Sequence, residues 1–308
     1  MFKKILFATT ASALCNDAAG VAFELAKKYS SKLYIFHVLG FPTRGFGAFV
    51  VDFKTGEQEY YSQDYISKVK EEIEKTYAGQ LKEIDNYVIE TTAGVPHTEI
   101  LRLARKEDVD LIIMGPHTRE AKGAQSYRSI VGSTMQGVTQ KARCPVMIVG
   151  RPVPKEKLEF KNIIFGTDFS KASDAAFLFA YKVAKKLGSK LSLFHALDIV
   201  PSPGSAIHQQ EEIETKLEEV TKKIKDRYAA KMEGFDKYEV KTWEGIPYME
   251  IVKFARRKEA DLIVMAHHSK EKDPEKALLG STVEQVVIRA GCPVVSVNRP
   301  EKIAESVE

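Results

Sequence analysis

The stretch KNIIFGTDFSKASDAAFLFAYKVAKKLGSKLSLFHAL, residues 161–197, decides the fold, because nearly the same sequence occurs earlier in the chain. Residues 3–39, KKILFATTASALCNDAAGVAFELAKKYSSKLYIFHVL, align to it without a gap. Two later segments also repeat, with residues 94–118 matching 245–269 and residues 131–150 matching 279–298. A repeat of about 150 residues has the size of a whole domain, whereas solenoid units run to about 20–50 residues. The sequence therefore predicts two copies of one domain, residues 1–150 and 161–298, with residues 150–160 as the linker.

Short apolar runs alternate with helical patterns inside each copy. Residues 5–9 (ILFAT) and 33–38 (LYIFHV) are apolar without alternation, which is typical of strands covered on both faces. Between them, residues 16–28 carry alanine, valine and leucine at helical spacing. Further strands are predicted at residues 87–92, 111–115 and 146–150, and further helices at residues 62–84, 96–105 and 133–140. Strands that alternate with helices imply right-handed βαβ units, so we expect an α/β fold whose parallel sheets have helices on both faces.

The first copy has a longer connection after its second strand. The chain spans 55 positions from Leu39 to Gly94, against 48 from Leu197 to Gly245. The extra residues fall within residues 41–63, where FVVDF, KTG and EQEYY predict a small hairpin. This connection leaves the carboxyl end of a strand, where open α/β sheets bind ligands. A flap over a pocket, a partner contact and plain decoration all remain open for it.

Composition limits the classes of function. The chain has 308 residues, of which 44% are hydrophobic and 29% charged, and its net charge of +4 comes from interleaved lysine and glutamate. The sequence has no concentrated basic tract, which argues against nucleic-acid binding. It has no apolar stretch near the ~20 residues of a membrane span, so we expect no membrane association. Three cysteines, an odd number, argue against a disulfide framework and favour a reducing cytoplasm.

A motif of small residues precedes the last helix of each copy. Glycine lets the backbone approach a ligand closely, and hydroxyl and N–H groups at a helix N-terminus complement an anion. The same tripeptide is also an ordinary helix N-cap, so the motif alone leaves phosphate binding and capping open. The motifs are Gly132, Ser133 and Thr134 in the first copy and Gly280, Ser281 and Thr282 in the second.

Catalytic motifs give little support for an enzyme. The sequence lacks a P-loop, a G-x-S-x-G motif and a Cys/His metal cluster. Cys144 and Cys292 occupy equivalent places in the two copies and fit small buried side chains. We therefore expect binding rather than catalysis, and no metal site.

Taken in order, the motifs resemble the universal stress protein family. The pattern ILxxxDxS, HV, G-x-P, DLIxMG, GST and CPVxxV occurs in the same order in both copies with single departures, so the resemblance covers nearly the whole chain and points to a tandem member. It implies a five-stranded parallel sheet of order 3-2-1-4-5 in each copy, of the adenine-nucleotide alpha-hydrolase-like class. It also implies that the two copies pair through their last strands, residues 146–149 and 294–297. Many members of the family bind ATP or related adenine nucleotides through an Asp that ends the first strand and a G-x2-G-x9-G-[ST] signature.

Neither copy keeps the whole signature. The first copy has Thr10 where the family has the Asp, and the second copy keeps that residue as Asp168. A Cβ atom at a signature glycine restricts the backbone conformation there. The first copy keeps Gly115, Gly132 and Ser133 but has Thr118 as the second glycine's replacement; the second keeps Gly280 and Ser281 but has Ala266 and Ser269 as replacements for the first two glycines.

The resemblance therefore implies that ATP, ADP or AMP binds mainly in the second copy. The adenosine would lie near Asp168 and the backbone at Ala196, and the phosphates would lie at Gly280, Ser281 and Thr282. A weaker site in the first copy would use Gly115, Gly132, Ser133 and Thr134. Asp168 also suits a helix cap or a turn, which is the ordinary role of an aspartate followed closely by serine.

Two functions of different classes remain open. One is an adenine-nucleotide-responsive protein of regulation or stress protection. The other is a nucleotide-free tandem scaffold that acts through protein–protein contacts. Slow ATP hydrolysis is a third and weaker alternative, and the outer faces of the paired copies leave a homodimer open.

Overall fold

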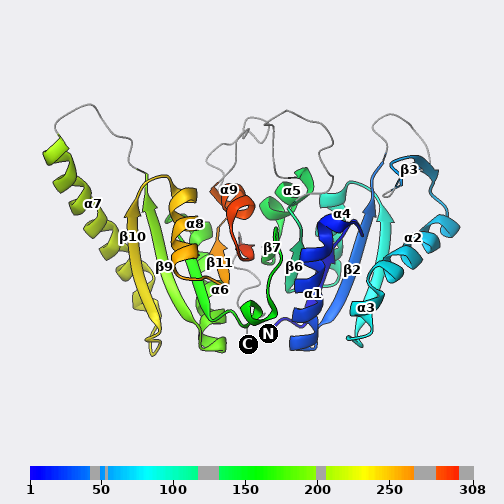
Figure 1. Cartoon of the computed structure of the whole chain (residues 1–308), viewed down its shortest axis with the longest axis horizontal. Helices are drawn as coiled ribbons and strands as arrows, with labels where there is room; N and C mark the ends of the chain where they lie inside the picture. The colour runs from blue at the N-terminus through cyan, green and yellow to red at the C-terminus, as the bar shows by residue number, and fades with distance from the viewer. Residues whose placement is uncertain (42–48, 53–54, 117–131, 199–205, 267–281, 298–308) are drawn as a thin grey trace.

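The computed structural model shows one sheet of ten strands that runs through both copies (Figure 1). It describes residues 1–41, 49–52, 55–116, 132–198, 206–266 and 282–297. The sheet strands of the first copy are β1 (Lys4–Ala8), β2 (Lys32–Leu39), β5 (Tyr87–Ala93), β6 (Leu111–Met114) and β7 (Val146–Ile148). Those of the second copy are β8 (Asn162–Gly166), β9 (Lys190–Leu197), β10 (Tyr238–Glu244), β11 (Leu262–Met265) and β12 (Val294–Ser296).

Each copy contributes five parallel strands in the order 3-2-1-4-5. The first copy runs β5-β2-β1-β6-β7 and the second runs β10-β9-β8-β11-β12. The fold class predicted from the sequence is therefore confirmed. The central strands β1 and β8 are apolar on both sides because helices cover both faces of the sheet.

The two copies join through their last strands. β7 and β12 pair antiparallel, with Met147 opposite Val295 and both side chains buried. This confirms the predicted junction. An apolar edge strand left unpaired would invite association with other chains, and the pairing satisfies both edges within one chain.

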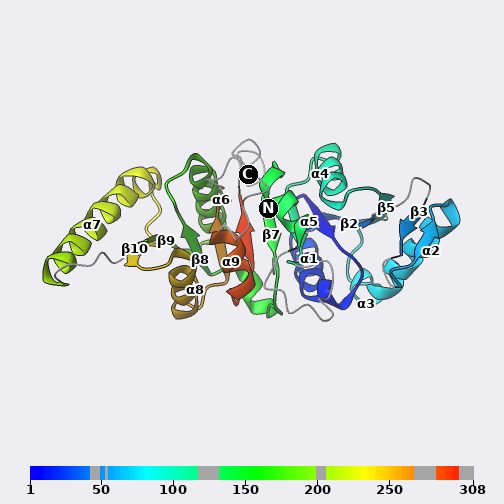
Figure 2. The same ribbon diagram turned by 90° about the horizontal axis from the view of Figure 1, so that it is seen from above.

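Helices form one layer on each face of the sheet. One buried apolar cluster unites α1, α2, α6 and α7 with the sheet, and a second unites α4, α5, α8 and α9 with the other face. Figure 2 shows α6 and α8 on opposite sides of the second half, as α1 and α4 are in the first. Within the described residues, no helix combines the length and apolarity needed to cross a bilayer. The bounds are α1 (Asn16–Tyr29), α2 (Gln63–Thr76), α4 (Pro96–Lys106), α5 (Ser133–Lys141), α6 (Lys171–Leu187), α7 (Ala206–Arg227), α8 (Pro247–Arg257) and α9 (Thr282–Arg289).

The helix predicted over residues 62–84 is interrupted at Tyr77. α2 ends at Thr76, and a short α3 (Ala78–Leu81) follows. The buried Tyr77 hydroxyl shares a hydrogen bond of 2.6 Å with the hydroxyl of Thr9, at the end of β1. The second copy repeats the arrangement, because Tyr228 follows the end of α7 and meets Thr167 at 2.9 Å. This contact joins residues 68 positions apart, so the local sequence pattern carries no signal for it.

The predicted hairpin is present in the longer connection of the first copy. β3 (Phe49–Val51) and β4 (Gln58–Tyr60) pair antiparallel, and Gly56 has φ 76° in the turn between them. The hairpin is tied to α2, because the Tyr65 hydroxyl donates to Asp52 Oδ2 at 2.7 Å. The described part of the insertion thus pairs as a hairpin and contacts α2, while its role as a flap or partner contact stays a prediction.

The linker packs against both halves. It forms a short 3-10 helix, η2 (Lys155–Glu159), and the side chain of Leu158 is buried. Lys155 pairs with Glu24 on α1 at 2.5 Å, and Lys157 pairs with Asp261 before β11 at 2.8 Å. This segment therefore holds the two copies together as well as connecting them.

Candidate functional site

Three predicted site residues of the second copy lie at or just beyond the carboxyl ends of parallel strands. Asp168 follows β8, Ala196 lies near the end of β9, and Ala266 follows β11. Because β8 lies between β9 and β11, these three positions come together at one edge of the sheet. Ser269, Gly280 and Ser281 of the same predicted site lie outside the described residues, as does Thr118 in the first copy.

Asp168 closes the turn that leads from β8 into α6. Its Oδ1 accepts a hydrogen bond of 2.9 Å from the Ser170 N–H and one of 2.5 Å from the Ser173 hydroxyl. Ser170 in turn caps α6, because its hydroxyl accepts from the Ser173 N–H. The turn role proposed for Asp168 is therefore real. Asp168 is also exposed, so the same carboxylate can meet a ligand.

The turn is held from a second side by an arginine. Arg227, the last residue of α7, donates to both carboxylate oxygens of Asp174 at 2.8 Å. A guanidinium matched to a carboxylate in this way fixes geometry as well as charge. The pKa of Arg227 is raised, chiefly by the hydrogen bond to Asp174, with a further contribution from the negative charge of Asp168.

The first copy replaces this carboxylate with a neutral residue. Thr10 stands at the place of Asp168, and its hydroxyl shares a hydrogen bond of 2.8 Å with Ser12 and lies 3.3 Å from the sulfur of Cys15. Thr10 cannot supply the negative charge that Asp168 does. The two copies therefore differ at the residue on which the predicted adenosine contact depends.

A neutral histidine supports the strand end in each copy. His37 and His195 place Nδ1 at 2.8 Å and 2.7 Å from the carbonyl oxygens of Thr9 and Thr167. A carbonyl only accepts, so Nδ1 carries the proton in both rings. Burial lowers the pKa of each histidine, and the backbone hydrogen bond opposes this in part. These rings are supports for the turn rather than surface charges.

The rings around Asp168 were not anticipated from the sequence. Phe169, which has φ 62°, places its ring 4.9 Å from that of His195. The ammonium of Lys223 on α7 lies 4.3 Å from the centre of the Phe169 ring. Ser173 was also missed, although its alignment with Cys15 of the first copy was visible in the repeat. The cation and the aromatic ring come from segments far apart in the chain, so local patterns carry no signal for their contact.

The two helix N-termini that the sequence predicts as phosphate sites differ between the copies. α5 begins after Gly132, its described first turn contains no acidic residue, and the N–H of Gly132 donates to the carbonyl of Pro116 at 2.9 Å. Ser133 is exposed and Thr134 is buried. The first turn of α9 instead contains Glu284, whose side chain is buried. A carboxylate there complements the helix dipole and competes with a phosphate for it.

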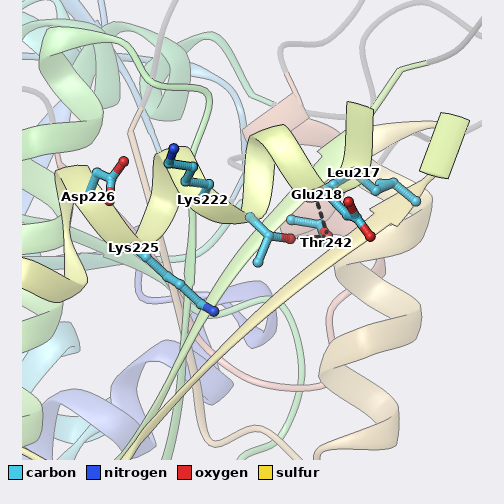
Figure 3. Close-up of a pocket in the computed structure, with 7 residues that line it drawn as sticks. Leu217, Glu218, Lys222, Lys225, Asp226 and Thr242 are labelled. Carbon is cyan, nitrogen blue, oxygen red and sulfur yellow. Dashed lines mark hydrogen bonds between the residues drawn. The ribbon is translucent and has the colours of Figure 1, made fainter. Parts of the chain in front are cut away.

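A separate hollow of about 420 Å³ opens between α7 and β10 (Figure 3). Thr242 of β10 lines it and shares a hydrogen bond of 2.8 Å with Thr221 of α7. Of the predicted site residues that the structure describes, none lines this hollow. Among the described residues, no group of three histidine, cysteine or acidic side chains could hold a metal ion. The lining residues are Leu217, Glu218, Thr221, Lys222, Lys225, Asp226 and Thr242.

Comparison with known sequences identifies relatives for both copies. The model of the universal stress protein family matches residues 1–150 and again residues 159–298. A universal stress protein of Methanocaldococcus jannaschii is 35% identical over 158 residues, which make up 49% of this chain and 84% of that protein. A second one from the same organism is 31% identical over 98 residues, or 30% of this chain and 57% of that protein.

Comparison with solved structures supports the whole tandem fold. A universal stress protein from Archaeoglobus fulgidus has a TM-score of 0.68 at 23% identity, with 97% of each chain covered. A functionally unknown protein from Pseudomonas aeruginosa has a TM-score of 0.59 at 17% identity, covering 99% of this chain and 96% of that one. At these identities the likeness shows the fold alone.

Proposed function

Because the chain belongs to the universal stress protein family, we propose that it is a stress or regulatory protein that binds an adenine nucleotide, mainly in its second half. The observation that carries this proposal is the exposed carboxylate of Asp168 at the carboxyl end of β8. A ligand at this edge of the sheet would meet Asp168, Ala196 and Ala266 together. The odd number of cysteines fits a cytoplasmic protein.

Asp168 has the chemistry for an adenosine contact. A carboxylate accepts hydrogen bonds from hydroxyl or amino groups, and an ionised acceptor makes them stronger. Loss of one such bond costs about 1.5–3 kcal/mol, or roughly ten- to a hundredfold in affinity. Thr10 in the first half has neither the charge nor the reach of Asp168, which supports unequal binding by the two halves.

Calorimetric titration with ATP tests this proposal. We expect wild-type chain to bind and the Asp168→Ala variant to bind roughly ten- to a hundredfold more weakly. Thr10→Ala is the matched control in the first half and should leave the affinity unchanged. If Thr10→Ala weakens binding and Asp168→Ala does not, the site is in the first half.

A nucleotide-free scaffold is the second candidate. Ala266 adds a Cβ atom at a place where the family signature has glycine, and Glu284 puts a carboxylate in the first turn of α9. Both features oppose a phosphate in the second half. Mass spectrometry of small molecules released from purified, denatured protein distinguishes the candidates. A wild-type chain that carries no nucleotide and gives no heat with ATP supports the scaffold.

A further inference from the structure

The two copies differ by a coupled exchange of two residues in the turn after the first strand. The gap-free alignment makes Thr10 the counterpart of Asp168 and Cys15 the counterpart of Ser173. In each copy the two residues contact one another. The distance is 2.5 Å from Ser173 Oγ to Asp168 Oδ1 and 3.3 Å from Thr10 Oγ1 to Cys15 Sγ. The first copy therefore lacks both the carboxylate of Asp168 and the Ser173 hydroxyl that donates to it.

The Ser173 hydroxyl is built into the protein interior. Its side chain is only 1% exposed, and it lies in the first turn of α6. The hydroxyl donates to the Asp168 carboxylate and accepts from the Asp168 N–H at 3.3 Å. It therefore links the side chain of Asp168 to the backbone of the same residue. Together with the Ser170 N–H it fixes the side-chain rotamer of Asp168 before any ligand arrives.

We propose that Ser173 is a positioning residue that presents the Asp168 carboxylate to a hydroxyl or amino donor of the nucleotide. This inference rests on the proposed function. The pair of Asp168 and Ser173 then explains why the second half would bind the nucleotide and the first half would not. A thiol is a weak hydrogen-bond donor, and threonine has no charge, so Thr10 and Cys15 can neither supply nor orient a carboxylate. The stoichiometry that follows is one nucleotide per chain.

The first test is a double-mutant cycle read by calorimetric titration with ATP. Ser173→Ala should weaken binding about five- to tenfold, the loss expected for one net hydrogen bond. In an Asp168→Ala background the same change should have no further effect, because the group that Ser173 orients is gone. A merely structural role would give the same loss in both backgrounds.

A matched control comes from another serine of the second half. Ser189 is also buried, and its hydroxyl has no hydrogen-bond partner among the residues that the structure describes. Ser189→Ala should leave ATP affinity unchanged. If wild type binds and Ser173→Ala binds equally well, the positioning role is wrong while the proposed function stands. If wild type binds no ATP, the proposed function itself fails.

The second test transfers the pair to the first half. The double variant Thr10→Asp with Cys15→Ser should bind two ATP molecules per chain where wild type binds one. Thr10→Asp alone should give a weaker second site, because its carboxylate would face the Cys15 thiol. A wild-type stoichiometry of two, or a double variant that still binds one, would overturn the claim that this pair restricts binding to one half.

Discussion

At the scale of single residues, the buried histidines make stability depend on pH. The pKa of His37 and of His195 is lowered from 6.5 by burial, so the unfolded chain binds more protons than the folded one below this pH. The contribution of these two histidines to the free energy of unfolding is then fully present above about pH 6.5, and it is lost as the pH falls through their folded pKa values. We expect the free energy of unfolding in urea to decrease from about pH 7 to about pH 5.

A double variant checks the origin of this slope. Asn keeps a side-chain N–H that can donate to Thr9 or Thr167, and it does not titrate. The His37→Asn/His195→Asn variant should therefore lose less stability than wild type on acidification over the same range. An unchanged slope would assign the acid sensitivity to other groups.

One glycine is required by both conformation and space. Gly245 has φ 127°, and a Cβ atom there would lie 3.0 Å from Cγ of the buried Glu250. Gly245→Ala should lower the free energy of unfolding by about 1–3 kcal/mol, the usual range for backbone strain of this kind. Gly20 is the control, because it lies in α1 with open space around its Cβ position. Gly20→Ala should stabilise the protein by about 0.5–1 kcal/mol, and equal losses in both variants would contradict the argument.

At the scale of elements, the linker stabilises the protein more through its apolar residue than through its exposed ion pair with Glu24. Leu158 is buried, whereas Lys155 is 71% exposed in its pair with Glu24. Leu158→Ala should cost about 2–5 kcal/mol in unfolding free energy, because it leaves a cavity. Lys155→Ala should cost less than about 1 kcal/mol, as surface ion pairs do. Urea denaturation of the two variants gives the comparison, and a larger loss for Lys155→Ala would refute it.

At the scale of the whole molecule, the paired strands β7 and β12 form the seam that joins the two copies. The Val295 side chain is fully buried at this seam, opposite Met147. A charged side chain there has no water around it, so Val295→Asp should cost more than about 3 kcal/mol or prevent folding. Tyr238→Asp, on the partly exposed outer strand β10, is the control and should cost about 1 kcal/mol or less. Similar losses would mean that the seam contributes little.

The pairing of the inner strands leaves β10 and β5 as the outer strands of the sheet. A homodimer through these outer surfaces stays a prediction, which sedimentation of the full chain at several concentrations would test. The boundaries of the copies at residues 150 and 161 also stay a prediction. The shared sheet and the packed linker mean that the two copies need not behave as independent units.

The sequence by itself determined the duplication and the alternation of strands with helices, which follow from the repeat and from apolar periodicity. The strand order and the junction through the last strands were expected from the resemblance to the universal stress protein family. Asp168 was singled out because it matches the Asp of the family's binding signature, and its difference from Thr10 in the first copy is visible without coordinates.

Only the tertiary structure decided how those residues are used. It showed that Ser173 and the Ser170 N–H hold Asp168, that Tyr77 after the end of α2 bonds to Thr9, and that the linker packs on both halves. It also brought Lys223 over the ring of Phe169. Most of these contacts join residues that are far apart in sequence, and the geometry of the Asp168 turn depends on the helix packed behind it. Hydrophobic pattern specifies which segments are buried, while the partner of each polar group depends on how the buried segments meet.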